Sequence, residues 1–213
     1  MVVSVKICGL KTPDAVTAAI EEGTDFIGLN FYEPSPRYVD VGIATYIARY
    51  IPDKTKIVGL FVDPDDNTLA NTLTHVRLDM IQLHGTETPE RVAAIREKFG
   101  KPVMKVIPVT GKDSLICVDS YEAVADWLMF DAKGEKLPGG NGISFDWSIL
   151  KDRTFKKPWM LAGGLNVYNL QEALSILSPT AVDVSSSVES EPGVKDPDKI
   201  RAFIKLALSS ATS

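Results

Sequence analysis

Two patterns of apolar and polar residues alternate along the chain. Short apolar runs, typical of strands buried on both faces, are followed by longer stretches in which apolar residues recur every three or four positions, as in amphipathic helices. Strands are predicted at residues 3–8, 26–31, 56–62, 80–83, 103–107, 127–130, 159–161 and 181–184. Helices are predicted at 13–22, 43–50, 66–73, 89–98, within 114–125, near 147–150, at 166–177 and at 197–208.

This alternation repeats about eight times without a linker, so residues 1–213 are expected to form one domain. Strands that alternate with helices form parallel sheets, because parallel neighbours need crossover connections. Eight units favour a single-domain (β/α)8 TIM barrel. A doubly wound open sheet is the alternative fold. The first strand lacks the G-x-G-x-x-G turn of a dinucleotide site, and this absence argues against the doubly wound open sheet.

Composition excludes several classes of partner. The net charge is -5, so there is no basic surface to attract nucleic acid or an anionic membrane, and no apolar run is long enough to span a bilayer. The two cysteines, Cys8 and Cys117, have no metal-ligand spacing, and a metal site is not expected. With no recognisable signal peptide, a cytoplasmic protein is predicted.

In a barrel, the residues at the carboxyl ends of the strands converge on one mouth. The candidates there are Cys8, Arg37, Gln82, His84, Asp131 and Asp183. Each has a plainer interpretation: a lone cysteine is usually an inert core residue, and Arg37 could be a surface cation. However, a thiol and a carboxyl from strands one and six lie across the mouth from each other. Such a pair could act as general base and general acid.

Small residues follow the last three strands and indicate a phosphate site. Glycine lets backbone N–H groups approach an anion, and the loops after strands seven and eight form the recurrent phosphate site of these barrels. The predicted phosphate-binding residues are Gly142, Gly163, Gly164, Ser185 and Ser186. No Walker-type lysine motif occurs, which favours a small phosphoester over a nucleotide.

An ordered set of motifs resembles the phosphoribosylanthranilate isomerase family over nearly the whole chain. The motifs are Lys6-Ile7-Cys8-Gly9-Leu10, Ser35-Pro36-Arg37, Gln82-Leu83-His84-Gly85, Asp131, Gly139-Gly140-Asn141-Gly142, Leu161-Ala162-Gly163-Gly164-Leu165 and Val182-Asp183-Val184-Ser185-Ser186.

The resemblance implies an Amadori rearrangement of N-(5′-phosphoribosyl)anthranilate in tryptophan biosynthesis, without metal or cofactor. It implies Asp131 as general acid, Cys8 as general base, Arg37 as the residue that binds the anthranilate carboxylate, and Asp183 as a substrate contact. A monomer or homodimer that binds a phosphorylated small molecule is expected.

Two positions depart from the family pattern: Ser187, where glycine is usual, and Asn141, where threonine is usual. If position 187 needs a positive φ, serine is strained there; alternatively, its hydroxyl contacts phosphate.

Three other functions compete. An indole-3-glycerol phosphate synthase would need a catalytic lysine and glutamate that cannot be placed, and a histidine-pathway isomerase would be expected to have aspartate at position 8. A catalytically silent barrel that binds a phosphorylated metabolite is the third.

Overall fold

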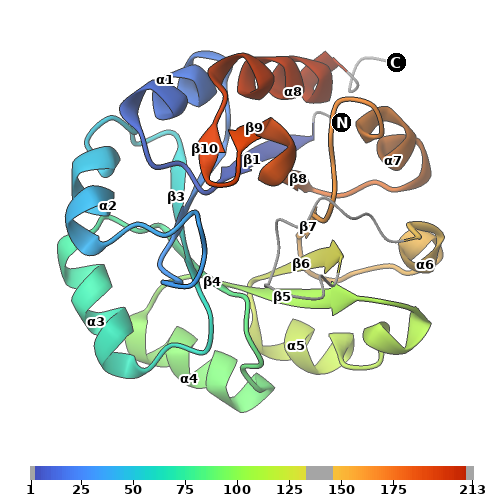
Figure 1. Cartoon of the computed structure of the whole chain (residues 1–213). Helices are drawn as coiled ribbons and strands as arrows, with labels where there is room; N and C mark the ends of the chain where they lie inside the picture. The colour runs from blue at the N-terminus through green and yellow to red at the C-terminus, as the bar shows by residue number, and fades with distance from the viewer. Residues whose placement is uncertain (1–2, 133–145, 210–213) are drawn as a thin grey trace.

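Eight parallel strands close into a barrel in the order β1 to β8, surrounded by helices (Figure 1). This computed structural model describes residues 3–132 and 146–209. The strands are β1 (Ser4–Cys8), β2 (Phe26–Asn30), β3 (Lys56–Phe61), β4 (Met80–Leu83), β5 (Val103–Val109), β6 (Trp127–Ala132), β7 (Trp159–Leu161) and β8 (Ala181–Val184). The predicted (β/α)8 barrel is confirmed, and the open doubly wound sheet is wrong.

The helices follow the strands that they cover. They are α1 (Pro13–Glu21), α2 (Val41–Ala48), α3 (Asp66–His75), α4 (Pro89–Phe99), α5 (Val118–Val124), α6 (Ser148–Lys151), α7 (Leu170–Ile176) and α8 (Pro197–Ser209), with short 3₁₀ turns η1 (Lys112–Leu115) and η2 (Ser186–Val188). The helix α7 begins later than expected, because Asn166 accepts hydrogen bonds from the backbone of residues 168 and 169 in the preceding turn. No helix among the described residues is long and apolar enough to cross a membrane.

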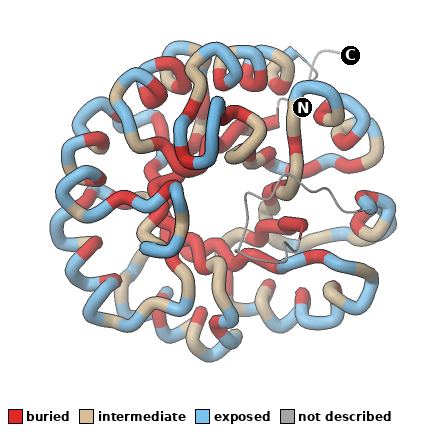
Figure 2. The backbone as a smooth tube through the Cα atoms, viewed as in Figure 1, coloured by how far each residue is buried: buried red, intermediate tan, exposed pale blue. Residues whose placement is uncertain are grey.

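Side chains alternate between two cores along every strand. An outer core lies between the strands and the helices, and an inner core that includes Val58, Met104, Met129 and Met160 fills the barrel. Buried backbone accordingly forms a ring at the centre of the molecule, while the outer helix faces are exposed (Figure 2). The barrel is packed rather than hollow, so ligand chemistry is confined to the ends of the strands.

Four similar clasps join the amino-terminal ends of neighbouring strands. Asp25 stands before β2, its backbone N–H donates to the carbonyl of Val5 at 3.0 Å, and its carboxylate accepts from the N–H of Val5 at 2.8 Å. The same two-way contact joins Asp79 to Ile57, Asp126 to Val103 and Thr180 to Trp159. Each clasp ties an odd-numbered strand to the even-numbered strand that follows it.

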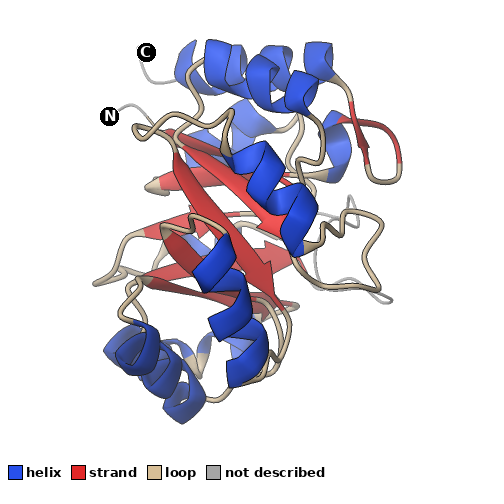
Figure 3. Ribbon diagram, turned by 90° about the vertical axis from the view of Figure 1, so that its left-hand side faces the viewer, coloured by secondary structure: helices blue, strands red, loops and turns tan. Residues whose placement is uncertain are grey.

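A small antiparallel hairpin, β9 (Glu189–Glu191) and β10 (Val194–Lys195), follows β8 and was not predicted. It projects from the end of the barrel at which the parallel strands finish (Figure 3). Its strands are too short to produce a recognisable alternation of apolar residues. Gly193 turns the hairpin at a φ of 83° and packs so closely on the carbonyl of Pro36 that a Cβ atom would lie 2.3 Å from that oxygen.

Candidate active site

The last residue of β1 places a thiol at the mouth of the barrel. Cys8 is 5% exposed, and its side chain lies against β2 where Gly28 leaves room for it. A Cβ atom at position 28 would lie 2.9 Å from the Cys8 sulfur. The next residue, Gly9, has a φ of 81° and packs against the side chain of Arg37. The Cys8-Gly9 pair therefore brings a thiol and a guanidinium group to the same edge of the mouth.

Beneath Cys8, a buried ion pair lies inside the barrel. Lys6 is fully buried, and its Nζ donates to Asp183 Oδ1 at 2.7 Å, between residues that are register partners in β1 and β8. Burial alone would lower the pKa of Lys6, but the Asp183 carboxylate and the Cys8 thiol raise it above its usual value. The ammonium group of Lys6 is thus charged and hydrogen-bonded to Asp183.

The pKa of Cys8 reflects opposing influences. Burial raises it, and the nearby carboxylate of Asp183 raises it further. The cations Lys6 and Lys195 both oppose this rise, and Lys6 does so through a hydrogen bond as well as its charge. The net result is a pKa above its usual value, so most of the thiol is protonated at neutral pH.

Asp131 is the penultimate residue of β6, lies on the inner face of the barrel and is 5% exposed. His84 Nε2 lies 3.2 Å from Asp131 Oδ2, and His84 Nδ1 lies 3.3 Å from Gln82 Nε2. The three side chains thus form a row from β4 to β6. The Gln82 Oε1 atom is buried and has no hydrogen-bond partner among the described residues. Sequence reasoning named these residues but did not foresee their contact with one another.

The loops after β7 and β8 form a pocket together with the two inward-facing aspartates. Its lining comprises Asp131, Gly163, Gly164, Leu165, Asp183, Val184, Ser185 and Ser186. Both glycines have positive φ values, 86° and 67°, and a Cβ atom at Gly163 would lie 2.3 Å from the backbone nitrogen of Ala132. Four of the predicted phosphate-binding residues are therefore brought together. The fifth, Gly142, lies outside the described residues, as does Asn141.

The structure contradicts the expectation of a strained backbone at Ser187. Its φ is not positive, since Asp63 is the sole non-glycine residue with positive φ among those described. Its hydroxyl donates to the carbonyl of Leu165 at 2.5 Å, and a contact of this hydroxyl with phosphate stays a prediction. Ser187 therefore joins the loop after β8 to the loop after β7.

Arg37 is buried in a bidentate ion pair that the sequence did not reveal. Its Nε donates to Glu189 Oε1 at 2.7 Å, and its Nη2 donates to Glu189 Oε2 at 2.8 Å. Glu189 belongs to the hairpin that follows β8, and Lys195 on the same hairpin also donates to it. The only available signal was an acidic residue and a lysine close behind the serine run, which is too common a pattern to indicate a site.

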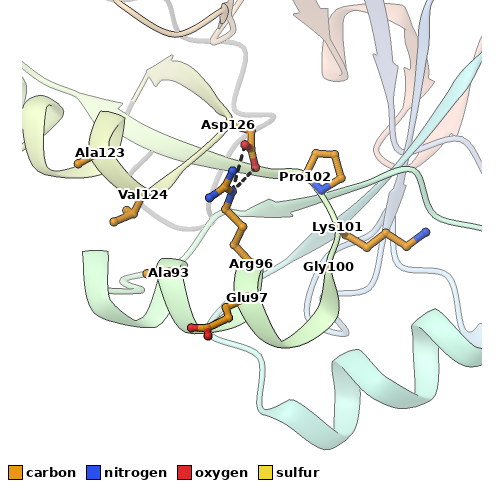
Figure 4. Close-up of a pocket in the computed structure, with 9 residues that line it drawn as sticks. All are labelled: Ala93, Arg96, Glu97, Gly100, Lys101, Pro102, Ala123, Val124 and Asp126. Atoms are coloured by element: carbon orange, nitrogen blue, oxygen red, sulfur yellow. Dashed lines mark hydrogen bonds and ion pairs between the residues drawn. The ribbon is translucent and has the colours of Figure 1, made fainter.

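A larger pocket lies at the opposite end of the barrel strands, between α4 and α5 (Figure 4). It is lined by Arg96, Lys101, Pro102 and Asp126, among others. Arg96 points across it and pairs with Asp126, whose carboxylate also belongs to one of the four clasps. Arg96 and Asp126 thus serve the structure of the barrel at the end opposite to the predicted site.

Comparison with known proteins agrees with this geometry. Residues 5–206 match the family model described as N-(5′phosphoribosyl)anthranilate (PRA) isomerase. The N-(5′-phosphoribosyl)anthranilate isomerase of Paramagnetospirillum magneticum is 58% identical over 97% of this chain and 98% of its own length. The crystal structure of phosphoribosyl anthranilate isomerase from Thermotoga maritima has a TM-score of 0.88 and 34% identity, covering 96% of this chain and 98% of that chain.

A second crystal structure shows such an enzyme with a ligand. It is a phosphoribosyl anthranilate isomerase in complex with reduced 1-(o-carboxyphenylamino)-1-deoxyribulose 5-phosphate. It has a TM-score of 0.84 and 33% identity, and covers 96% of this chain and 98% of that chain.

Proposed function

The chain belongs to the N-(5′-phosphoribosyl)anthranilate isomerase family, and on that premise we propose that Cys8 and Asp131 carry out the isomerisation as general base and general acid. The substrate is N-(5′-phosphoribosyl)anthranilate, and the product is 1-(2-carboxyphenylamino)-1-deoxyribulose 5-phosphate. The observation that carries this assignment is the placement of a buried thiol and a buried carboxyl on β1 and β6, both facing the mouth.

Asp131 acts first. Its carboxyl group donates a proton to the ribose ring oxygen, the C1′–O bond breaks, and the ring opens to a protonated Schiff base. The contact with His84 holds the carboxyl group on the mouth side of β6. Gln82 in turn orients His84 through its ring nitrogen, and its unpaired Oε1 is suited to accept a hydrogen bond from the substrate.

Cys8 acts second. As a thiolate it removes the proton from C2′, and the electron pair moves towards the Schiff base nitrogen to give an enolamine, which tautomerises to the ketone. Proton transfer of this kind is typically worth ~10²–10⁴-fold in rate. The Lys6 ammonium stabilises the thiolate, and the positive charge that the Schiff base acquires favours proton abstraction at the adjacent carbon.

Binding is divided between the two edges of the mouth. Arg37 binds the anthranilate carboxylate, although its guanidinium group is already paired with Glu189 and must share its donors. Gly163, Gly164, Ser185 and Ser186, with Gly142 from the loop outside the described residues, bind the phosphate. Asp183 contacts the substrate from β8 while it holds Lys6.

The decisive experiment is a fluorescence assay of the purified protein that follows the loss of the anthranilate substrate. We expect turnover without added metal or cofactor. A folded protein that binds a product analogue but does not consume substrate would favour the silent barrel instead. The cytoplasmic location and the monomeric or homodimeric state remain predictions, the latter to be tested by sedimentation.

A further inference from the structure

The hairpin β9–β10 contributes two buried charges that the reaction scheme above does not use. The side chains of Glu189 and Lys195 are 4% and 2% exposed, and Lys195 Nζ lies 2.8 Å from Glu189 Oε1. Charged side chains this well buried are costly unless they are paired. Glu189 is the centre of the cluster, because its carboxylate also accepts from Arg37 and from the backbone N–H of Gly193.

Lys195 is connected to Cys8 by a short chain of hydrogen bonds. Lys195 Nζ donates to the carbonyl oxygen of Ser185 at 2.8 Å and to its hydroxyl oxygen at 3.2 Å. The same hydroxyl group donates to the carbonyl oxygen of Cys8 at 3.1 Å. These contacts fix the ammonium group of Lys195 beside the end of β1, at the edge of the mouth that holds the thiol.

We propose that Lys195 is a positioning residue whose buried charge stabilises the Cys8 thiolate, and that Glu189 holds this charge in place. The proposal rests on the function assigned above, since it concerns the proposed base. It gives the hairpin a part in proton abstraction, although neither residue contacts the reacting atoms.

The other charges around Cys8 explain why a second cation matters. Lys6 and Asp183 lie 2.7 Å apart and act on the thiol in opposite directions, so the Asp183 carboxylate offsets part of the effect of Lys6 on the pKa of Cys8. Lys195 lowers the pKa of Cys8 from the β10 side. The titratable groups that act most strongly on Lys195 itself are Glu189, Cys8 and Arg37.

Glu189 is needed because burial works against Lys195. Burial lowers the pKa of Lys195 below its usual value, and the Glu189 carboxylate and the Cys8 thiol offset part of that fall. Burial alone would raise the pKa of Glu189, but Arg37 and Lys195 hold it below its usual value. The carboxylate is therefore ionised and able to keep a proton on Lys195.

The test is a titration of the thiol that needs no turnover. In a Cys117→Ser background, the ultraviolet absorbance of the Cys8 thiolate is followed against pH, with the Cys8→Ser/Cys117→Ser protein as the reference. Lys195→Met should move the titration midpoint up by about one pH unit, in line with the loss of a neighbouring opposite charge. Lys195→Gln serves the same purpose should Lys195→Met not fold, and Lys195→Arg should restore the midpoint.

Lys199→Met is the matched control. Lys199 is exposed and also contacts the hairpin, through the backbone carbonyl of Glu189, but it is not among the charges that act on Cys8. Its variant should leave the midpoint unchanged. An equal midpoint in folded Lys195→Met and the parent, or an equal shift in both lysine variants, overturns the proposal. Absence of turnover in the parent would instead overturn the proposed function and leave the titration result standing.

Discussion

His84 Nε2 and Asp131 Oδ2 lie 3.2 Å apart, joining the ends of β4 and β6 across the strand between them. Because the imidazole is anchored by Gln82, it fixes where the carboxyl group of the proposed acid points. A general acid that is displaced from its substrate oxygen loses much of its effect. We therefore expect His84→Asn to lower kcat by about 10-fold with little change in KM. His75→Asn, a substitution in the exposed α3, is the control, and an unaltered kcat for His84→Asn would remove His84 from the mechanism.

The two proposed proton-transfer groups should be needed to similar degrees. Cys8→Ala and Asp131→Asn should each lower kcat by at least ~100-fold, the scale expected when acid–base catalysis is lost. Steady-state kinetics with phosphoribosylanthranilate as substrate measures kcat for both variants. Cys117→Ala, which removes the exposed thiol, should retain normal kinetics. Near-normal turnover in either active-site variant would refute the role assigned to it.

The side chain of Arg37 should contribute chiefly to binding. Arg37→Ala removes the group proposed to pair with the anthranilate carboxylate, so KM should rise by about 10-fold or more while kcat falls less. Glu189 keeps Lys195 as a partner in this variant, which limits the structural damage. Arg49→Ala, at an exposed position after α2, is the matched arginine control. If KM stays the same, Arg37 is not in contact with the substrate.

A further buried ion pair, Lys105–Glu87, supports the loop that follows His84. Lys105 Nζ lies 2.6 Å from Glu87 Oε2 and donates to the carbonyl of Gly85 at 2.7 Å, and Glu87 accepts from the backbone N–H groups of Asp63 and Gly85. Lys105→Met leaves the Glu87 charge buried without its counter-ion, and should lower the free energy of unfolding by about 3 kcal/mol.

Urea unfolding measures that loss, and Lys98→Met is its control. Lys98 pairs with Asp66 at the surface, where water screens the charges, so a far smaller loss is expected. If Lys105→Met and Lys98→Met lower the free energy of unfolding equally, burial does not govern the contribution of the Lys105–Glu87 pair to stability.

The barrel itself could be predicted from the sequence because each element carries its own signal. The apolar run at Met80–Leu83 and the Thr88-Pro89 start of α4 appear in the structure at the positions expected from strand and helix rules. Closure of the barrel then placed Cys8 and Asp131 at one mouth, since the carboxyl ends of parallel strands converge.

What could not be predicted depends on contacts between distant parts of the chain. Arg37 and Glu189 are separated by 152 positions, and nothing local to either residue indicates the pair. A positive φ was expected to strain Ser187, but its φ is not positive, and its hydroxyl donates to the carbonyl of Leu165 in the neighbouring loop. The spacing of apolar residues predicts which face of a helix or strand is buried. It does not predict which charged side chains pair with one another in the interior.

The four clasps divide the barrel into quarters, each a strand, helix, strand and helix closed by its own carboxylate or hydroxyl group. Every quarter carries its closure within its own sequence, whereas the two proposed reacting groups, Cys8 and Asp131, come from the first and third quarters. The scaffold is therefore built from repeated units, whereas the proposed site needs residues from more than one of them. Exchanging one quarter with that of a relative would preserve the scaffold, but it would replace only a fraction of the catalytic set at a time.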